Sequence, residues 1–396
     1  MAKYFIINPG SDSKKYALYE DGTQKFSVHF EREGGKIVAT VKKDGQSQKA
    51  EVSQKDYDSS IDYLLQLMVK DKVIAEKTEI SGAGVRVVAP GDYFAAHKII
   101  DGEYLEKLRE ESRQAPLHLK PTILEIENLN RVFPEISMVG ISDSAFHADL
   151  PKHSRLYNLP QEMAEKFGIY RFGYHGISAQ SVLGKIKNRL GNVPSKTIIC
   201  HLGSGSSIHA VKDGASFDTT MGFTPLEGLT MGTRIGNIDA GAVLFLLQES
   251  RMSPAELEDY FNTKCGLLGL SGKTPDIREL IELENAGDAN AKIALDAFTY
   301  SVRKYIGAYT AALGGLDLLV FTATIGERSS IMRERICRGL ESLGIRIDEE
   351  KNNGTVNRDG FIEKEGSSPV KVAVIATDEM GQMAYETATL CDRATS

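Results

Sequence analysis

The sequence has few cysteines, and none of them are paired in a motif. Cys200, Cys265, Cys337 and Cys391 lie far apart and form no CxxC pattern. We therefore expect neither a disulfide framework nor a structural zinc site, and a reducing, cytoplasmic setting is favoured. The chain also lacks an apolar run of roughly 18 residues, the length that predicts a membrane span. Its first residues, MAKYFIINPG, lack the apolar core of a signal peptide, so no membrane association is expected.

Positive charge is not in excess, because the formal net charge is −7. This argues against a general nucleic-acid or anionic-membrane binder, although a local basic site for an anionic substrate stays open. Low-complexity segments are absent, and 41% of the residues are hydrophobic. A chain of 396 residues predicts about two domains with large cores that need no covalent or metal staples.

Three common catalytic motifs are missing. No segment matches GxxxxGK[ST], so the chain is not a P-loop enzyme. No GxGxxG turn opens a helix, which disfavours a dinucleotide fold, and no HExxH spacing indicates a zinc enzyme.

A repeat is present instead. FIINPGSDSKKYALYEDG at 5–22 and IICHLGSGSSIHAVKDG at 198–214 both read as strand, Gly/Ser turn, strand and Asp-Gly. A shift of 193 positions places Gly10 on Gly203, Ser13 on Ser206 and Asn8 on His201. Two such hairpins predict two similar halves, the alternative being a chance match of short hairpins.

The remaining pattern indicates an α/β protein with mixed sheets covered by helices. Helical periodicity covers 58–70, 101–113, 119–130, 178–190, 239–249, 254–262, 276–315 with a break near Ala286-Gly287, 328–343 and 378–392. Strand-like runs cover 82–88, 137–142, 196–201, 317–322 and 370–376. Ligands bind at strand ends in such sheets. The apolar strands end at Asn8, Arg86, Asp143, His201, Thr322 and Thr377.

Several residues could carry chemistry at these ends. The turn HLGSGSS at 201–207 could gather backbone N–H groups around an anion, the alternative being a plain tight hairpin. His175 is one of six histidines within about ninety residues, and a histidine beside a phosphate loop could donate to a charged transition state. A structural histidine is the alternative.

Two arginines stand in apolar or glycine-rich surroundings, and two carboxylates follow strands. Arg86 and Arg234 need anionic partners, either a substrate or a buried salt bridge. Asp143 and Glu379 are plausible Mg²⁺ ligands or orienting groups, and Glu379 could equally stabilise a helix N-terminus. Asp276 and Arg278 begin a helix and could simply cap it.

These segments together resemble the acetate kinase family along essentially the whole chain. The family's NxGSSSxK and RVVxxG correspond to residues 8–15 and 86–91, and APLH to 115–118. DTAFH corresponds to 143–147, GFHGxS to 173–178, HLGxGSS to 201–207 and MGFTPLEGLxMGTRxGxID to 221–239. SDxR and TNEE correspond to 275–278 and 377–380.

The resemblance implies two duplicated ribonuclease-H-like, actin-like ATPase domains with the active site in the interdomain cleft. The N-terminal domain would comprise 1–147 plus 379–396, with a returning C-terminal helix. The domain at 148–378 would bind nucleotide and form a homodimer. The implied reaction is reversible phosphoryl transfer between ATP and acetate, giving ADP and acetyl phosphate, with Mg²⁺ or Mn²⁺ as cofactor.

The resemblance also implies roles for individual residues. The catalytic set would be Arg86, Asp143, His175 and Arg234, with Asn8 and Glu379 placing the metal. The acetate methyl would face Val88, Leu117, Tyr174 and Pro225. Nucleotide and phosphates would contact Ser11, Ser13, Lys15, His201, Gly203, Ser204, Gly205, Ser206, Asp276, Ile277, Arg278, Thr324, Ile325, Gly326, Glu327 and Arg328.

Departures from the family pattern leave alternatives open. Thr324 and Arg328 alter the adenosine loop, so pyrophosphate is the alternative donor, and a propionate or other short-chain acyl kinase is the alternative acceptor reading. A non-catalytic actin-like nucleotide switch is the remote alternative, since it would leave Arg86, His175 and Arg234 without a purpose.

Overall fold

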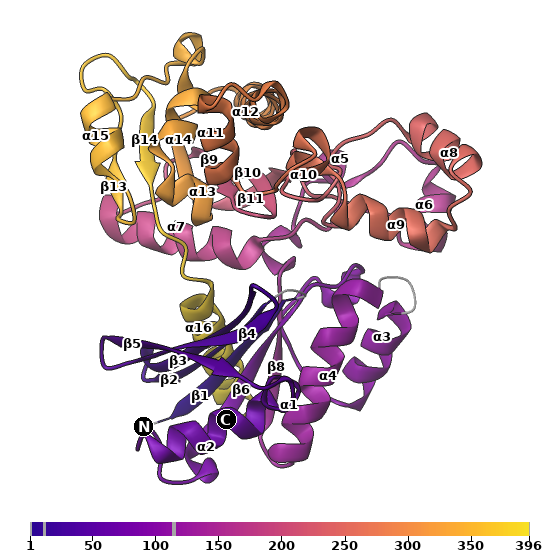
Figure 1. Cartoon of the computed structure of the whole chain (residues 1–396), viewed down its shortest axis with the longest axis vertical. Helices are drawn as coiled ribbons and strands as arrows, with labels where there is room; N and C mark the ends of the chain where they lie inside the picture. The colour runs from indigo at the N-terminus through magenta and orange to yellow at the C-terminus, as the bar shows by residue number, and fades with distance from the viewer. Residues whose placement is uncertain (1, 11–12, 113–115, 396) are drawn as a thin grey trace. The chain divides into compact units, whose positions relative to one another are not determined.

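The computed structural model describes residues 2–10, 13–112 and 116–395. The chain divides into two compact units (Figure 1). Unit 1 comprises Met1–Ala145 and Asp378–Ser396, and unit 2 comprises Phe146–Thr377. Each unit contains one mixed sheet flanked by helices, as the sequence predicts.

The sheet of unit 1 has the order β5-β4-β3-β2-β1-β6-β8-β7. The first five strands form an antiparallel meander, whereas β1, β6 and β8 run parallel. The strands are β1 (Lys3–Pro9), β2 (Ser13–Glu20), β3 (Thr23–Glu33), β4 (Lys36–Lys43), β5 (Gln46–Val52), β6 (Ile80–Val87), β7 (Lys98–Ile99) and β8 (Ser137–Ser142). The helices are α1 (Gln54–Asp58), α2 (Ser60–Lys70), α3 (Gly102–Ser112), α4 (Pro116–Val132) and α16 (Glu379–Thr395).

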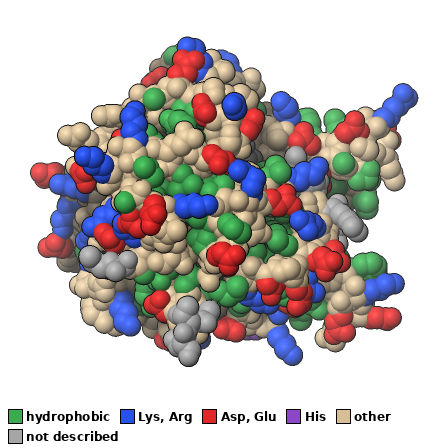
Figure 2. All heavy atoms as spheres, turned by 90° about the horizontal axis from the view of Figure 1, so that it is seen from below, with side chains coloured by type: hydrophobic (Ala, Val, Ile, Leu, Met, Phe, Trp, Pro, Cys, Tyr) green, Lys and Arg blue, Asp and Glu red, His purple; other side chains and the backbone are tan. Residues whose placement is uncertain are grey.

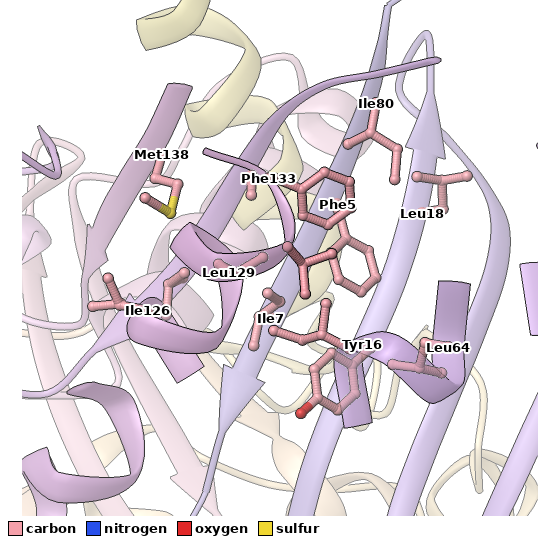
Figure 3. Close-up of a cluster of buried hydrophobic side chains, with 14 of the residues drawn as sticks. Phe5, Ile7, Tyr16, Leu18, Leu64, Ile80, Ile126, Leu129, Phe133 and Met138 are labelled. Carbon is pink, nitrogen blue, oxygen red and sulfur yellow. The ribbon is translucent and has the colours of Figure 1, made fainter. Parts of the chain in front are cut away.

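Helices cover both faces of this sheet. On one face, Phe5, Ile7, Tyr16 and Leu18 pack with residues of α2, α3 and α4, among them Leu64, Ile126 and Leu129 (Figure 3). The opposite face carries α16, which returns the C-terminal end of the chain to unit 1 (Figure 1). Gly82 and Gly84 permit its close approach, because a Cβ at Gly84 would lie 2.0 Å from Thr387 Oγ1.

The sheet of unit 2 has the order β11-β10-β9-β12-β14-β13. α7 (Gly176–Leu190) packs on the face that carries Ile199, Val211 and Val320, and α12 (Ala289–Leu313) packs on the other. The strands are β9 (Lys196–Leu202), β10 (Ser206–Lys212), β11 (Ala215–Thr219), β12 (Leu318–Thr322), β13 (Gly360–Phe361) and β14 (Lys371–Val374). The other helices are α5 (Lys152–Arg155), α6 (Gln161–Phe167), α8 (Ala240–Glu249), α9 (Pro254–Thr263), α10 (Gly266–Ser271), α11 (Ile277–Asn285), α13 (Ala323–Arg328), α14 (Ser330–Cys337) and α15 (Glu349–Gly354).

The strand pairing confirms the predicted repeat and corrects its alignment. In each sheet an antiparallel hairpin, β1–β2 or β9–β10, continues into parallel strands, β6–β8 or β12–β14. The paired residues next to the turn are Pro9 and Lys14 in the first hairpin, and Leu202 and Ser206 in the second. The second turn is therefore one residue shorter, so Ser206 corresponds to Lys14, not to Ser13.

Most predicted elements are confirmed, including the helix break at Ala286-Gly287 between α11 and α12. The meander β3–β5 was missed, although Asp21-Gly22, Gly34-Gly35 and Asp44-Gly45 are hairpin signals whose central residues all have positive φ. Residues 324–328, predicted as a loop, instead form the short helix α13.

The surface of the molecule is mixed in charge. Figure 2 shows acidic and basic side chains interspersed over the face that it presents. Among the described residues, no helix combines the length and apolar character needed to cross a membrane.

Candidate active site

In unit 1, three polar residues meet at the carboxyl ends of parallel strands. The register pairs Ile7 with Val85 and Arg86 with Ile141, so the ends of β1, β6 and β8 lie side by side. Arg86 Nε and Nη2 donate to Asp143 Oδ1 and Oδ2 at 3.2 and 2.9 Å. Arg86 Nη1 lies 3.4 Å from Asn8 Oδ1. Arg86 can therefore form a buried salt bridge and also bind an anionic substrate. Its Nε and Nη2 bind the buried carboxylate of Asp143, and its Nη1 points toward Asn8.

The charges of this cluster depend on one another. Asp143 has only 1% of its side chain exposed, and Arg86 has 17%. Burial by itself lowers the pKa of Arg86, but the charges of Asp143 and Glu379 and the Asp143 hydrogen bond raise it above its ordinary value. Arg86 thus stays cationic in a half-buried position, as a binder of anions requires.

The residues predicted to place a metal supply two oxygen-bearing side chains in unit 1. Asn8 is the residue before the end of β1, and Glu379 is the first residue of α16. Within the described residues no cluster of three or more His, Cys, Asp and Glu side chains could hold a metal. A sparse set of this kind suits Mg²⁺, which keeps several waters and is bound through one or two carboxylates and substrate phosphates.

The first Gly/Ser turn and the start of β2 carry three further candidate residues. Ser11 lies outside the described residues, whereas Ser13 is half-buried and Lys15 is exposed. Lys15 stands directly opposite Asn8 in the β1–β2 ladder. Its neighbour Lys14 points to the other face, where it pairs with Glu125 at 2.5 Å.

In unit 2, His175 occupies a special backbone position. It is the residue before α7 and has a φ of 59°, in the left-handed region that non-glycine residues rarely adopt. Its ring stacks on His201 at a centroid distance of 4.1 Å, and its Nδ1 lies 3.0 Å from Ser207 Oγ. Strain of this kind is common at functional sites, where neighbouring groups hold a side chain in place.

Arg234 and His175 both converge on Gly205 in the second Gly/Ser turn. A Cβ at Gly205 would lie 3.1 Å from Arg234 Nη1 and 3.5 Å from His175 Nε2. The turn is braced by Ser206, whose hydroxyl donates to the Gly203 carbonyl at 3.0 Å, and by the Ser204 carbonyl, which accepts from Gly232 N. Ser206 therefore serves the hairpin itself, while Gly205 leaves room beside a guanidinium and an imidazole.

The candidate nucleotide residues form two helix starts in unit 2. Asp276 caps α11 by accepting from Arg278 N, and the Arg278 side chain folds back onto the same carboxylate. The Arg278 hydrogen bond lowers the pKa of Asp276. Ile277 is buried in the core. Asp276 therefore caps the helix, as the sequence predicts, and a nucleotide contact of this segment stays a prediction.

α13 carries the other candidate nucleotide residues. Thr324 and Arg328 are exposed, and Ile325 is half-buried. Gly326 packs tightly, since a Cβ there would lie 3.2 Å from the backbone of Phe321. Glu327 accepts from Thr377 N at 3.0 Å, which ties α13 to the segment after β14.

The sequence analysis did not identify Arg333, whose side chain holds α13 in place through hydrogen bonds. Its fully buried guanidinium donates to the carbonyl oxygens of Gly326, Glu327, Asn352 and Thr355 and to Asn352 Oδ1. Burial lowers the pKa of Arg333 to about 10. Its position between Met332 and Ile336, both buried on α14, was the available signal.

The candidate acyl-binding residues belong to both units. Val88 is half-buried in unit 1, and only the backbone of Leu117 is described. In unit 2, Pro225 is buried, and the hydroxyl of buried Tyr174 donates to the Phe223 carbonyl at 2.7 Å. The Tyr174 hydroxyl is thus held by the backbone.

Known proteins agree with this arrangement. The model of the Acetokinase family matches residues 3–385. The acetate kinase of Bacillus mycoides is 39% identical over 99% of this chain and 100% of its own length. The acetate kinase of Clostridium botulinum is 42% identical over 97% of this chain and 98% of its own.

Solved structures extend the similarity to the fold. The acetate kinase of Porphyromonas gingivalis is 33% identical, with a TM-score of 0.87, over 98% of this chain and 100% of its own. A propionate kinase of Francisella tularensis is also 33% identical, with a TM-score of 0.90 and the same coverage. The duplicated α/β architecture of the actin-like ATPase type is confirmed, and the chain belongs to the acetokinase family.

Proposed function

We propose that this chain is an acetate kinase, which transfers the γ-phosphoryl group of ATP to acetate and gives acetyl phosphate and ADP reversibly. The observation that carries the proposal is the Arg86–Asp143–Asn8 cluster at the strand ends of unit 1. A cation held at 17% exposure by a buried carboxylate is suited to an anionic substrate. Family membership over the full chain supports the same reaction.

The chemistry is direct transfer. A carboxylate oxygen of acetate forms a bond to the γ-phosphorus while the bond from that phosphorus to the β–γ bridging oxygen breaks, and ADP leaves with the electron pair. A carboxylate is already a nucleophile, so no proton has to be removed. Catalysis then rests on positioning and on cations that stabilise the charge of the loose transition state.

Roles follow from the groups described above. Arg86 orients the carboxylate and the phosphoryl oxygens, and Asp143 fixes the guanidinium of Arg86. Arg234 and the Nε2 of His175 donate to the transferring phosphoryl group beside Gly205. The turn at 201–206 and the helix starts at 276–278 and 324–328 contact the nucleotide. Asn8 and Glu379 would hold a divalent metal, Mg²⁺ or Mn²⁺, which would neutralise phosphate charge, and Ser11, Ser13 and Lys15 would assist in binding the metal and the phosphates.

Two alternatives have specific support. The similarity to the Francisella tularensis propionate kinase favours testing propionate as acceptor. Exposed Thr324 and Arg328 on α13 favour testing pyrophosphate as donor.

Trapping of the acyl phosphate with hydroxylamine separates all of these. We expect acetyl hydroxamate to form readily with ATP and acetate, less propionyl hydroxamate to form with ATP and propionate, and little acetyl hydroxamate to form with pyrophosphate and acetate. Better turnover with pyrophosphate than with ATP would reassign the donor, and a preference for propionate would reassign the acceptor. A protein that binds ATP yet forms no acyl phosphate from any acceptor would instead be a nucleotide switch.

We also propose a homodimer and a cytoplasmic location. Large apolar side chains are exposed on unit 2, including Leu244 and Phe245 of α8 at 61% and 62%. Light scattering coupled to size-exclusion chromatography tests the dimer, and a monomeric mass at micromolar concentration would contradict it.

A further inference from the structure

A chain of hydrogen bonds leads from His175 into the core of unit 2. His175 Nδ1 lies 3.0 Å from Ser207 Oγ, which lies 2.9 Å from His209 Nε2. His209 Nδ1 lies 3.1 Å from Thr219 Oγ1. Only His175 is partly exposed; Ser207, His209 and Thr219 are completely buried.

The fold explains why these residues align. Ser207 and His209 are two positions apart on β10, so their side chains share the face that α7 covers. Thr219 is the cross-strand partner of His209 on β11. His175 stands at the start of α7, over the same face.

His209 is neutral in this position. Burial lowers its pKa well below the ordinary histidine value, and the nearby His147 and His201 lower it further. The His147 ring stacks on His209 at a centroid distance of 5.0 Å. A neutral imidazole carries one N–H, so one ring nitrogen of His209 donates and the other accepts.

The buried hydroxyl of Thr219 decides which nitrogen donates. Within the described part of the chain, His209 Nδ1 is the side-chain partner of this hydroxyl. If His209 carried its proton on Nδ1, the Thr219 proton would be left buried without an acceptor, which is costly. If Thr219 donates to Nδ1, the His209 proton lies on Nε2 and is given to Ser207, and the Ser207 proton is then given to His175 Nδ1.

We propose that this chain locks neutral His175 in the tautomer with its proton on Nε2, the nitrogen that would lie 3.5 Å from a Cβ at Gly205. The inference rests on the proposed function, in which His175 Nε2–H donates to the transferring phosphoryl group. With Nδ1 occupied as an acceptor, His175 presents a donor and not a lone pair to that group. His209, Ser207 and Thr219 are therefore positioning residues for the reaction, and none of them touches the substrate.

The tautomers can be measured directly in the whole enzyme without substrates. Protein labelled with ¹⁵N in histidine is examined by NMR near pH 8.5, about two units above the ordinary histidine pKa. Assignment uses His175→Gln and His209→Gln spectra. We expect both His175 and His209 to carry their proton on Nε2. A proton on Nδ1 of His175 would overturn the proposal, whatever the activity of the enzyme.

Variants then link the chain to turnover. For His209→Leu we expect kcat to fall about 10- to 100-fold with little change in KM, the range seen when a group that orients a functional histidine is lost. His209→Gln should restore most of the turnover, because its amide N–H can donate to Ser207 while its oxygen accepts from Thr219. Thr219→Val should show a smaller loss and a mixed His175 tautomer.

The matched control is Thr197→Val at the far end of β9, where the buried hydroxyl donates to the Pro194 carbonyl. It should leave kcat and the His175 spectrum unchanged. A His209→Leu enzyme with the kcat and spectrum of the native protein would refute the lock. An Nε2–H spectrum in a protein without acyl phosphate synthesis would leave the lock standing and refute the proposed function.

Discussion

The two sheets place different chemistry at equivalent strand ends. Asn8 follows Ile7, which pairs with Val85, and His201 pairs with Thr322, so Asn8 and Arg86 in unit 1 correspond to His201 and Thr322 in unit 2. By the same register Asp143 corresponds to Thr377. The positions are charged or amide-bearing in unit 1, and imidazole or hydroxyl in unit 2.

This difference shows how one framework serves two tasks. In unit 1 Arg86 and Asp143 form an ion pair, and the charge of Asp143 raises the pKa of Arg86. In unit 2 burial lowers the pKa of His209, and the hydrogen bonds that join its ring to Ser207 and Thr219 involve neutral groups. Charge attracts and orients anions, whereas a directed hydrogen-bond chain selects a tautomer.

Removing Arg86 should produce the largest effect. We expect Arg86→Ala to lower kcat/KM at least about a hundredfold, as loss of a transition-state donor does. It should also destabilise unit 1 by about 3–5 kcal/mol, because Asp143 would stay buried without its partner. Steady-state kinetics and urea unfolding measure the two losses separately.

The double variant Arg86→Ala/Asp143→Asn separates fold from function. It should regain much of the stability, because no buried charge is left alone, but none of the turnover. Thr322→Val, at the equivalent place in unit 2, should lower turnover and stability far less than Arg86→Ala does. Equal losses for Thr322→Val and Arg86→Ala would remove the contrast between the two sheets.

The next effect concerns the space beside Arg234 in unit 2. In Gly205→Ala the new methyl would lie 3.1 Å from Arg234 Nη1, so the guanidinium must move. We expect kcat to fall about tenfold, since small displacements of positioning groups are costly in phosphoryl transfer. Arg234→Ala, which removes the group, should cost at least about a hundredfold.

Gly184→Ala in the middle of α7 is the matched control for the added methyl. Apart from its chain neighbours and the backbone of its own helix, no heavy atom of the described residues lies within 4 Å of a Cβ at this position. The variant should keep its turnover and gain about 0.5–1 kcal/mol of stability, because alanine is the better helix former. Wild-type kinetics in Gly205→Ala would place Arg234 outside the reaction.

Much of this could be predicted from the sequence, for physical reasons. Strands with an unbroken apolar stretch, such as residues 318–321 within the strand predicted at 317–322, are recognised easily, and so are the polar residues where these strands end. The meander β3–β5 was missed although its signals were present, since Phe26, Val28 and Phe30 alternate with polar residues, the period of a half-buried strand. A register shift of one residue in a turn is invisible to a fixed 193-residue offset, which is why Ser13 and Ser206 were wrongly equated.

The sequence predicts which residues belong to the site, but not which of their side chains contact one another. Arg86 and Asp143 stood out singly, yet their bidentate pairing depends on the parallel register of β6 and β8. The link from His175 to His209 and Thr219 joins three separate elements, so spacing along the chain carries no trace of it. Arg333 was overlooked because its carbonyl partners come from loops and helix ends.

A smaller effect is expected for the metal. Glu379→Gln keeps the shape of the first residue of α16 and removes its charge. We expect the Mg²⁺ concentration for half-maximal activity to rise about fivefold, which corresponds to about 1 kcal/mol of charge attraction at high dielectric, together with a lower kcat. Glu386→Gln, on the same helix beside His97, should leave the Mg²⁺ titration unchanged. Equal titrations for the two variants would remove Glu379 from the metal site.

The smallest effect concerns the length of the acyl chain. A pocket fitted to a methyl group discriminates against one extra methylene by only about 1–3 kcal/mol, roughly tenfold or more. Acetate should therefore give the highest kcat/KM, with propionate weaker and butyrate poor. The Tyr174 hydroxyl is held by the Phe223 carbonyl, so it is not free to adjust to a longer chain. Half-buried, branched Val88 is then the residue whose size can be reduced without breaking a hydrogen bond.

Val88→Ala should raise the kcat/KM ratio of propionate to acetate about threefold or more, part of the full methylene discrimination. Val87→Ala is the control: Val87 is buried in the opposite core of unit 1, so its loss should lower stability without changing the ratio. An unchanged ratio in Val88→Ala would remove Val88 from the acyl site. A native enzyme that prefers propionate would reassign the acceptor and leave the contrast between charged and neutral strand ends intact, since that contrast concerns the phosphoryl group and not the acyl chain.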